Sequence, residues 1–197
     1  MPAKDDDALM PLPRPAIMPL AERQCRARLV ARGVRFEERP QLADKAGCSV
    51  PWPIAMTSLS ASIPLEPEAV LNCATAEAMA RFTADRIVPA ARDILGTTVA
   101  RIRQDSAYVC RPRNGTRKLS EHAFGNALDL GAFTFADGRV VTVGSAASRT
   151  EGEFLFALRL FACGPFTTVL GPGSDADHAS HFHFDLAKRR PGSTFCQ

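Results

Sequence analysis

Six cysteines spread along this chain of 197 residues limit its possible folds more than any other feature: Cys25, Cys48, Cys73, Cys110, Cys163 and Cys196. None of them forms a C-x-x-C pair, which argues against a zinc ribbon or a dithiol redox site. Their even number favours three disulfides, for which several connectivities are possible. The spacing suggests Cys25–Cys48, Cys73–Cys110 and Cys163–Cys196, each of which would restrict the unfolded chain. Six buried, reduced thiols are the alternative.

Disulfides would place the protein in an oxidising compartment. Residues 1–20 lack the basic start and the apolar run of a secretory signal, and no stretch approaches the roughly 20 apolar residues of a membrane span. We therefore expect an export signal outside this sequence and no integral membrane segment. The proline-rich residues 1–18 are typical of a flexible leader or linker, and residues 19–197 are expected to form a single domain.

The charge of the chain excludes one class of partner. It is 46% hydrophobic and 23% charged, with a net charge of only +3 and intermixed signs. No basic face for nucleic acid is therefore expected, and the charge permits only a weak attraction to an anionic polymer.

Hydrophobic periodicity predicts helices in the first half and strands in the second. Helices are expected over residues 20–32, 75–96 and 151–162, and Pro89 should kink or split the second of them. Residues 39–65 are rich in proline and serine and are expected to be mainly loop. Predicted strands cover 97–103, 106–112, 126–135, 139–144, 166–171 and 181–186, with a hairpin turn at 136–139. This order predicts an α+β fold whose antiparallel sheet carries any site, with helices packed against it.

Three of the four histidines lie within six positions of one another, in "HASHFHFDL". In a strand, His181, His183 and Asp185 share one face, and Phe182 and Phe184 share the other. The phenylalanines should face the core and the imidazoles a cleft. Neutral imidazole is the commonest protein ligand for zinc, and a catalytic zinc usually takes three protein ligands. This strand therefore predicts part of a zinc cleft.

The fourth histidine precedes a candidate carboxylate ligand. In "HAFGNALDL", His122 occupies a turn in which Gly125 permits a bend, and Asp129 interrupts an apolar strand. An acid between Leu128 and Leu130 needs a partner if it is buried. The alternative is that Asp129 caps a turn or pairs with an arginine, and that the histidines are ordinary surface residues.

These stretches resemble a known family. "YVCRPRNG", "SEHAFGNALDLGAF", "FTTVLGP" and "HFHFDLAKR" are similar to the extensin-like C-terminal domain family of bacteria, over roughly residues 25–196. More widely, H-x6-D followed by H-x-H resembles the lysostaphin, D-Ala-D-Ala metallopeptidase and hedgehog superfamily of zinc peptidases.

The resemblance implies roles for five residues. His122, Asp129 and His183 would be the zinc ligands, and His181 would stand beside the metal as the catalytic histidine. His178 completes an H-x2-H-x-H spacing that also resembles penicillin-insensitive murein endopeptidases, and it would assist His181.

Four other residues have less distinctive settings. Arg111 and Arg113 lie where metallopeptidases of this superfamily keep an arginine facing the substrate, although a solvated loop arginine would look the same. Ser120 is interpreted as a plain turn residue rather than a helper of the His122 turn. Trp52 lies in a proline-rich loop, where packing is favoured over substrate stacking.

The spacing of the histidines and the acid predicts the metal, and the resemblance implies the substrate class, so we expect a zinc-dependent peptidoglycan hydrolase of the bacterial periplasm. It would cleave peptide bonds in stem peptides or cross-links, as an endopeptidase or a carboxypeptidase. The alternative is a non-catalytic, zinc-stabilised module that binds the cell wall. The H-x2-H-x-H histidines favour the enzyme, because a structural zinc needs no proton shuttle.

Overall fold

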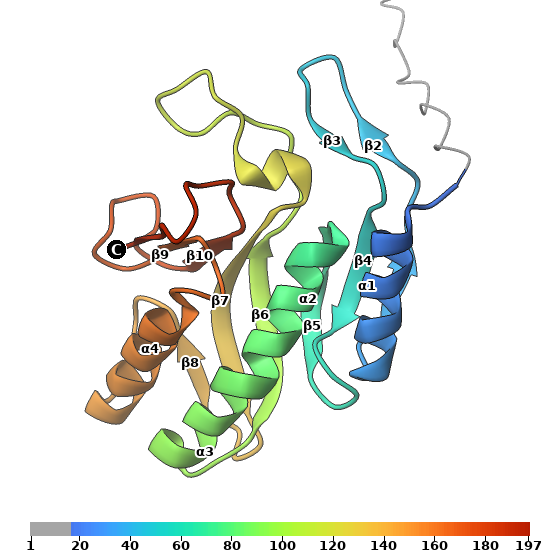
Figure 1. Cartoon of the computed structure of the whole chain (residues 1–197). Coiled ribbons are helices and arrows are strands. Elements are labelled where there is room, and N and C mark those ends of the chain that lie inside the picture. The colour runs from blue at the N-terminus through green and yellow to red at the C-terminus, as the bar shows by residue number, and fades with distance from the viewer. Residues whose placement is uncertain (1–16) are drawn as a thin grey trace, which may run out of the picture.

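A nine-stranded mixed sheet forms the centre of the computed structural model, which describes residues 17–197 (Figure 1). The strand order is β1-β4-β5-β6-β7-β10-β9-β11, and β8 pairs with β7. The strands are β1 (Phe36–Glu38), β4 (Ile54–Ser58), β5 (Pro64–Leu71), β6 (Val99–Ser106), β7 (Ala127–Phe135), β8 (Val140–Thr142), β9 (Thr168–Leu170), β10 (Phe182–Asp185) and β11 (Phe195–Cys196). A separate hairpin joins β2 (Leu42–Ala43) to β3 (Ser49–Val50). The predicted leader lies outside the described residues apart from its last two positions.

The prediction of an antiparallel sheet is wrong at two places. Strands β5 and β6 are parallel, because the chain crosses between them through helices, and β11 returns to lie parallel to β9. The other strand pairs of this sheet are antiparallel. The α+β class is confirmed, and the sheet is mixed.

Helices α1 to α3 lie over one face of the sheet (Figure 1). The predicted first and last helices are confirmed as α1 (Leu20–Ala31) and α4 (Arg149–Ala162). The predicted middle helix is split into α2 (Cys73–Phe82) and α3 (Val88–Leu95), joined by a π-helical turn over Thr83–Ile87. Pro89 causes this break, because proline has no N–H to donate to the preceding turn and its ring crowds that turn.

Two stretches differ from the sequence prediction. Residues 39–65 contain β2, β3 and β4 and the start of β5, although their prolines and serines suggested loop. The predicted strand over 106–112 is wrong, because the chain leaves the sheet after β6 and turns toward Cys48. The remaining predicted strands, and the 136–139 turn, are confirmed within a few residues.

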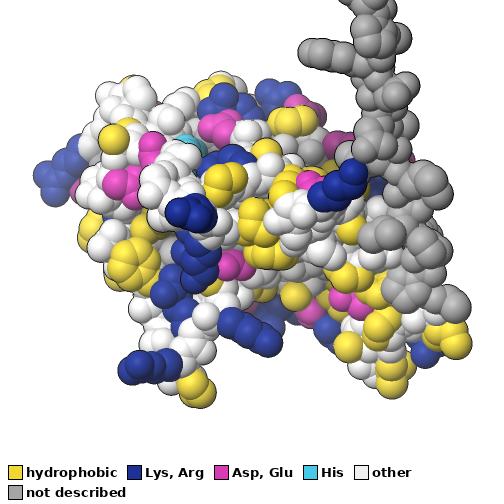
Figure 2. Space-filling view, turned by 90° about the horizontal axis from the view of Figure 1, so that it is seen from above, with side chains coloured by type: hydrophobic (Ala, Val, Ile, Leu, Met, Phe, Trp, Pro, Cys, Tyr) yellow, Lys and Arg dark blue, Asp and Glu magenta, His cyan; other side chains and the backbone are white. Residues whose placement is uncertain are grey.

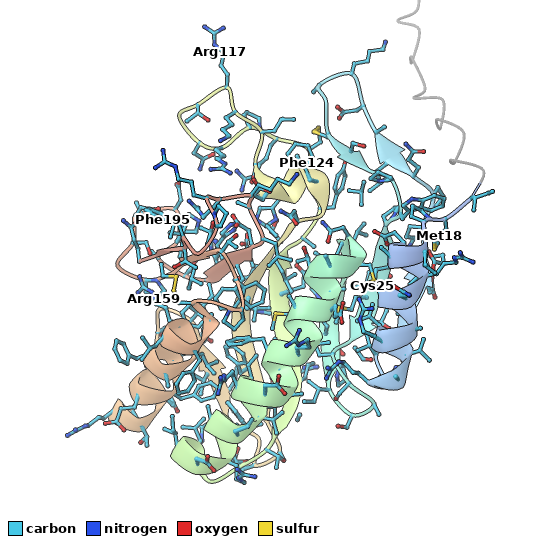
Figure 3. The ribbon with its side chains drawn as sticks, in the orientation of Figure 1. Met18, Cys25, Arg117, Phe124, Arg159 and Phe195 are labelled. Carbon is cyan, nitrogen blue, oxygen red and sulfur yellow. A yellow bond between two sulfur atoms is a disulfide. The ribbon has the colours of Figure 1, made fainter. Side chains whose placement is uncertain are left out.

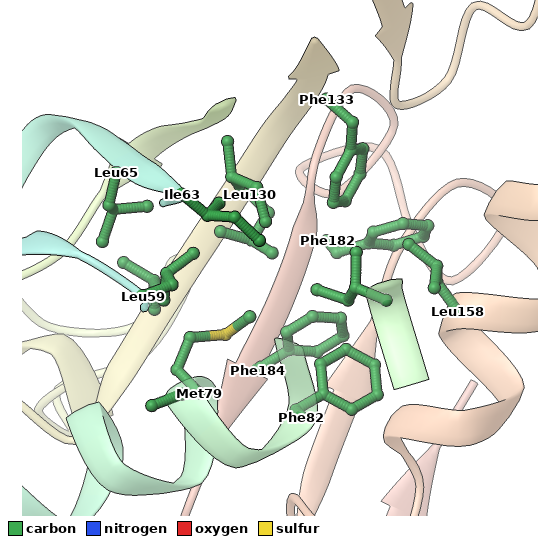
Figure 4. Packing of buried hydrophobic residues seen from close by; sticks show 14 of the residues in the cluster. Leu59, Ile63, Leu65, Met79, Phe82, Leu130, Phe133, Leu158, Phe182 and Phe184 are labelled. Atoms are coloured by element: carbon green, nitrogen blue, oxygen red, sulfur yellow. The ribbon is translucent and has the colours of Figure 1, made fainter. Parts of the chain in front are cut away.

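The core fills the space between the helices and the sheet (Figure 4). Phe82 of α2 makes edge-to-face contacts with Phe166 and Phe184, whose rings stack on each other with centroids 4.9 Å apart. On α4, Phe154 packs edge-to-face against Phe133 of β7. Aromatic packing of this kind fixes β7 and β10 relative to the helices.

Three disulfides connect distant parts of the chain, as predicted, but two pairings differ from the prediction. The structure joins Cys25 to Cys73, Cys48 to Cys110, and Cys163 to Cys196. Only the third bridge has the predicted partners, and the alternative of six reduced thiols is wrong. The prediction paired neighbours in sequence, whereas α1 packs against α2 and so brings the first cysteine to the third.

Candidate functional site

The pairing of β10 with β7 places two predicted ligands opposite each other. His183 is the register partner of Asp129, and the neighbouring Phe182 and Phe184 point into the core. Since successive side chains of a strand alternate between faces, His183 and Asp129 face away from the helices. The predicted division of this strand into a core face and a site face is confirmed.

His122 reaches the same place from a short 3-10 helix, η2 (Glu121–Phe124). Ser120 caps this turn by accepting a hydrogen bond from the His122 backbone N–H, so it supports the His122 turn and is more than the plain turn residue that the sequence suggested. Gly125 ends the turn with a φ of +59°, and a Cβ there would lie 2.7 Å from the backbone nitrogen of Asn72. The bend therefore requires glycine both for its backbone angle and for its closeness to a neighbouring segment.

Three potential ligand atoms converge at this point. Nδ1 of His183 lies 2.9 Å from Oδ1 of Asp129, and Nε2 of His122 lies 3.2 Å from the same oxygen. The two histidine nitrogens are 3.1 Å apart. The residues are buried, with exposed fractions of 1% for His122, 4% for Asp129 and 8% for His183. The alternative in which these histidines are surface residues and Asp129 pairs with an arginine is therefore wrong.

The outer nitrogen of each imidazole faces an acceptor. Nδ1 of His122 donates to the Ala107 carbonyl oxygen at 2.5 Å, and Nε2 of His183 donates to Oδ2 of Asp185 at 3.1 Å. These partners place the proton of each neutral ring on its outer nitrogen. When both rings are neutral, as metal binding requires, the inner nitrogens carry lone pairs, so three acceptors face one another. A cation suits this arrangement, and paired outer nitrogens are typical of histidines that bind metals.

Burial and mutual hydrogen bonds shift the pKa values of His183 and Asp129. Burial lowers the pKa of His183, but hydrogen bonds to Asp129 and Asp185 outweigh burial and raise this pKa to about 9. Burial raises the pKa of Asp129, but hydrogen bonds from His122 and His183 hold it well below its usual range. Without a metal, the buried Asp129 carboxylate is thus compensated by a proton on His183.

The other two histidines lie beside this group. Nε2 of His181 is 3.7 Å from Oδ2 of Asp129, and the rings of His181 and His178 have centroids 5.3 Å apart. Burial lowers the pKa of His181, so its ring is neutral at neutral pH. Nδ1 of His178 donates to Oδ1 of Asp175 at 2.6 Å, which holds the His178 ring beside His181.

All four histidines line one cavity of about 560 Å³. Figure 2 shows histidine atoms at this end of the molecule among acidic and basic side chains. Arg111 and Arg113 also line the cavity, and Arg113 forms an ion pair with Glu121 at 3.1 Å. Trp52 does not line this cavity; it is half-buried, and its backbone carbonyl accepts a hydrogen bond from Arg26.

A comparison with known families shows what kind of chain has this site. A family profile described as "Extensin-like protein C-terminus" matches residues 23–197. The chain belongs to this family. Neither a search of curated proteins nor a search of solved structures finds a significant match.

The extensin-like match includes all six cysteines and all four histidines, so the disulfides and the cavity belong to one family region. The resemblance to the extensin-like family is thereby confirmed, whereas membership of the wider zinc peptidase superfamily stays a prediction. Among residues 17–197, no helix is long and apolar enough to cross a membrane. Disulfides persist in oxidising surroundings, so the three bridges indicate a location outside the cytoplasm.

Several partners in the extensin-like site were missed by sequence reasoning. Asp185 was placed on the right face, but its hydrogen bond to His183 was not foreseen, although the H-x-H-x-D alternation could have suggested it. The Ala107 carbonyl comes from a segment predicted as strand, and Asp175 from a loop. A second group, Asp44 with Cys48 and Cys110, is no metal site, because its two sulfurs form a disulfide.

Proposed function

We propose that this protein is a zinc-dependent peptidoglycan hydrolase that works in the periplasm and cleaves peptide bonds in stem peptides or cross-links. One observation carries the proposal: Nε2 of His122, Oδ1 of Asp129 and Nδ1 of His183 converge within 3.2 Å, with the outer nitrogens of both histidines already paired. Two imidazoles and a carboxylate form a typical ligand set for catalytic zinc.

The surrounding residues fit hydrolysis of a peptide bond. Zinc bound there would polarise the scissile carbonyl and lower the pKa of a bound water. His181 is neutral at neutral pH and close to Asp129, so it can accept a proton from that water and return it to the leaving amine. His178, held by Asp175, lies next to His181 and can orient it. The open cavity gives a peptide access to these groups.

The substrate class follows from the resemblance of H-x6-D and H-x-H to the zinc peptidases of cell walls, and from the extensin-like family as a bacterial one. The location outside the cytoplasm is compatible with that substrate. A binding module that uses zinc only structurally would not need a neutral, half-buried histidine next to the ligands.

A digestion of purified peptidoglycan tests the proposal. The full chain should release peptide fragments that mass spectrometry can assign to a cleaved stem or cross-link, and a chelator should abolish this release. Restoring zinc should restore it. Release that continues at full rate in chelator would contradict a zinc mechanism, and zinc binding without release would leave only the non-catalytic module.

A further inference from the structure

The cavity contains an arginine that the mechanism above does not use. Arg189 follows β10 and lines the same cavity as the four histidines. Its Nη2 donates to Oγ1 of Thr168 at 2.6 Å, and its guanidinium carbon lies 5.3 Å from the centre of the Phe195 ring. Nε and Nη1 of Arg189 have no hydrogen-bond partner among residues 17–197.

Two rows of residues across the sheet explain why Arg189 lies near the ligands. In the first row, Asp129 of β7 pairs with His183 of β10. In the second row, Thr168 of β9 lies between Asp185 of β10 and Phe195 of β11. The rows are two residues apart along β10, so their side chains share one face.

A chain of hydrogen bonds crosses from one row to the other. Asp185 accepts hydrogen bonds from His183 and from the hydroxyl of Thr168, and that hydroxyl oxygen accepts the bond from Arg189. Arg189 is thus connected to the ligand group through two intermediate side chains.

The C-terminal segment holds the Phe195 ring in place beside Arg189. β11 pairs with β9, and the Phe195 backbone N–H donates to the Thr167 carbonyl at 2.8 Å. The Cys163–Cys196 bridge joins the residue after Phe195 to the end of α4. Phe195 is 42% exposed at the edge of the cavity, and Figure 3 shows it on the C-terminal side of the molecule, near β9 and β10. Its ring restricts where the guanidinium can point.

The charges of the cavity favour an anion at Arg189. Each acid that lines the cavity already has a polar partner within the described residues: Glu121, Asp129, Asp175, Asp177 and Asp185. Among residues 17–197, two arginines line the cavity without a carboxylate partner: Arg111 and Arg189. Within the described residues, the Arg111 side chain has one hydrogen bond, at 3.5 Å to the Pro112 carbonyl, whereas the Arg189 side chain is held by the Thr168 hydroxyl and the Phe195 ring.

We infer that Arg189, positioned by Phe195 and Thr168, binds a carboxylate group of the peptide substrate. This inference rests on the proposed function and adds a determinant of specificity to it. A guanidinium with free N–H groups matches a carboxylate, and charge-assisted bonds of this kind are the strong ones. Stem peptides of peptidoglycan carry carboxylates at their C-terminus and on side chains, and either could be the group that Arg189 binds.

Binding of a stem peptide to the full chain tests the inference. The probe is one synthetic stem peptide in three forms: unmodified, with a terminal carboxamide, and with amidated side-chain carboxylates. Calorimetry is done on chelator-treated protein, because a carboxylate could otherwise bind the metal directly. The unmodified peptide should bind roughly 10- to 100-fold more tightly than one of the amidated forms, and that form identifies the carboxylate.

Variants then assign this preference to Arg189. Arg189→Gln should abolish it, and Phe195→Leu should reduce it by about 2- to 5-fold. The control is Arg190→Gln, which removes an exposed arginine that does not line the cavity and should keep the preference. Equal binding of all three peptides to the unmodified protein would overturn the inference, as would an unchanged preference in Arg189→Gln.

The same peptides separate this inference from the proposed function. A preference for carboxylate in chelator-treated protein, without turnover when zinc is restored, would support the subsite and contradict the hydrolase. Turnover that responds equally to all three peptides would support the hydrolase and contradict the subsite.

Discussion

His183 and His181 are two residues apart in sequence, yet the structure gives them different surroundings. His183 is buried between Asp129 and Asp185, whereas His181 lies at the edge of the cavity with Asp129 as its nearest acid. This difference is the basis for the two roles that we propose: His183 would bind the metal, and His181 would transfer protons.

Alanine variants of these histidines should separate binding from catalysis. His183→Ala should lose zinc and turnover together, because two ligands bind zinc weakly. His181→Ala should keep zinc and lose roughly 10²- to 10⁴-fold in turnover, the usual effect of removing a positioned acid–base group. His178→Ala should show a milder loss of turnover. Zinc content and turnover are measured on the same preparations, and loss of zinc from His181→Ala but not from His183→Ala would reverse the assignment.

The raised pKa of His183 should make the proposed zinc binding pH-dependent. In metal-free protein, His183 is protonated below its pKa of about 9, and zinc needs the neutral ring. Binding at about pH 7.5 should therefore displace a proton from His183, and the apparent affinity should rise roughly tenfold per pH unit until pH 9. Calorimetry in buffers of different ionisation enthalpy measures the proton count. An affinity that falls as the pH rises from 7 to 9 would contradict the assignment of His183 as a ligand.

At the scale of elements, η2 and the start of β7 are joined by a turn that only glycine suits. Gly125→Ala should lower the free energy of unfolding by roughly 2 kcal/mol or more, because it adds backbone strain and a clash with the Asn72 backbone. It should also weaken zinc binding, since His122 lies on this turn. Chemical denaturation and zinc titration measure the two effects.

Gly138→Ala is the matched control for that variant. Gly138 also has a positive φ, of +84°, but a Cβ there would meet nothing within 4 Å. We expect a loss of about 1 kcal/mol and unchanged zinc binding. Equal losses of stability and equal zinc affinities in the two variants would show that the close approach at Gly125 does not matter.

β11 can be tested by removing its covalent link. In the Cys163→Ser, Cys196→Ser double variant, the free energy of unfolding should fall by about 2–4 kcal/mol, because the unfolded chain gains freedom. Zinc content should remain that of the unmodified protein, since none of the three proposed ligands lies on β11 or α4. Zinc loss accompanying removal of this bridge would contradict that separation.

Element prediction succeeded where local patterns were strong. The alternation in "HFHFDL" identified β10 and its two faces, and the apolar run around Asp129 identified β7. The strand β4 was missed, because "IAMTS" lies among prolines and serines and is stabilised by pairing with β1 and β5 rather than by its own pattern. The parallel pairs were missed for the same reason, as pairing direction depends on connections between distant segments.

For the whole molecule, the sequence indicated which residues form the candidate metal site, but it did not indicate two of the three disulfide pairings or the position of Arg189. His122 and Asp129 were grouped with His183 through motif spacing, and the fold brings them together. Two of the three disulfide pairings could not be found in this way, because they depend on how α1 packs on α2 and on where the chain leaves β6. The grouping of Arg189 with Thr168 and Phe195 was missed, because these residues meet only when β11 returns to β9.

We propose that His122, Asp129 and His183 hold one zinc on which hydrolysis depends. The most direct test is a titration of metal-free protein with zinc, in which bound metal and peptidoglycan turnover are measured together. Turnover should rise in proportion to bound zinc and level off at about one zinc per chain. A protein that binds no zinc at neutral pH, or whose turnover does not change as zinc binds, would contradict a zinc-dependent hydrolysis at these three residues.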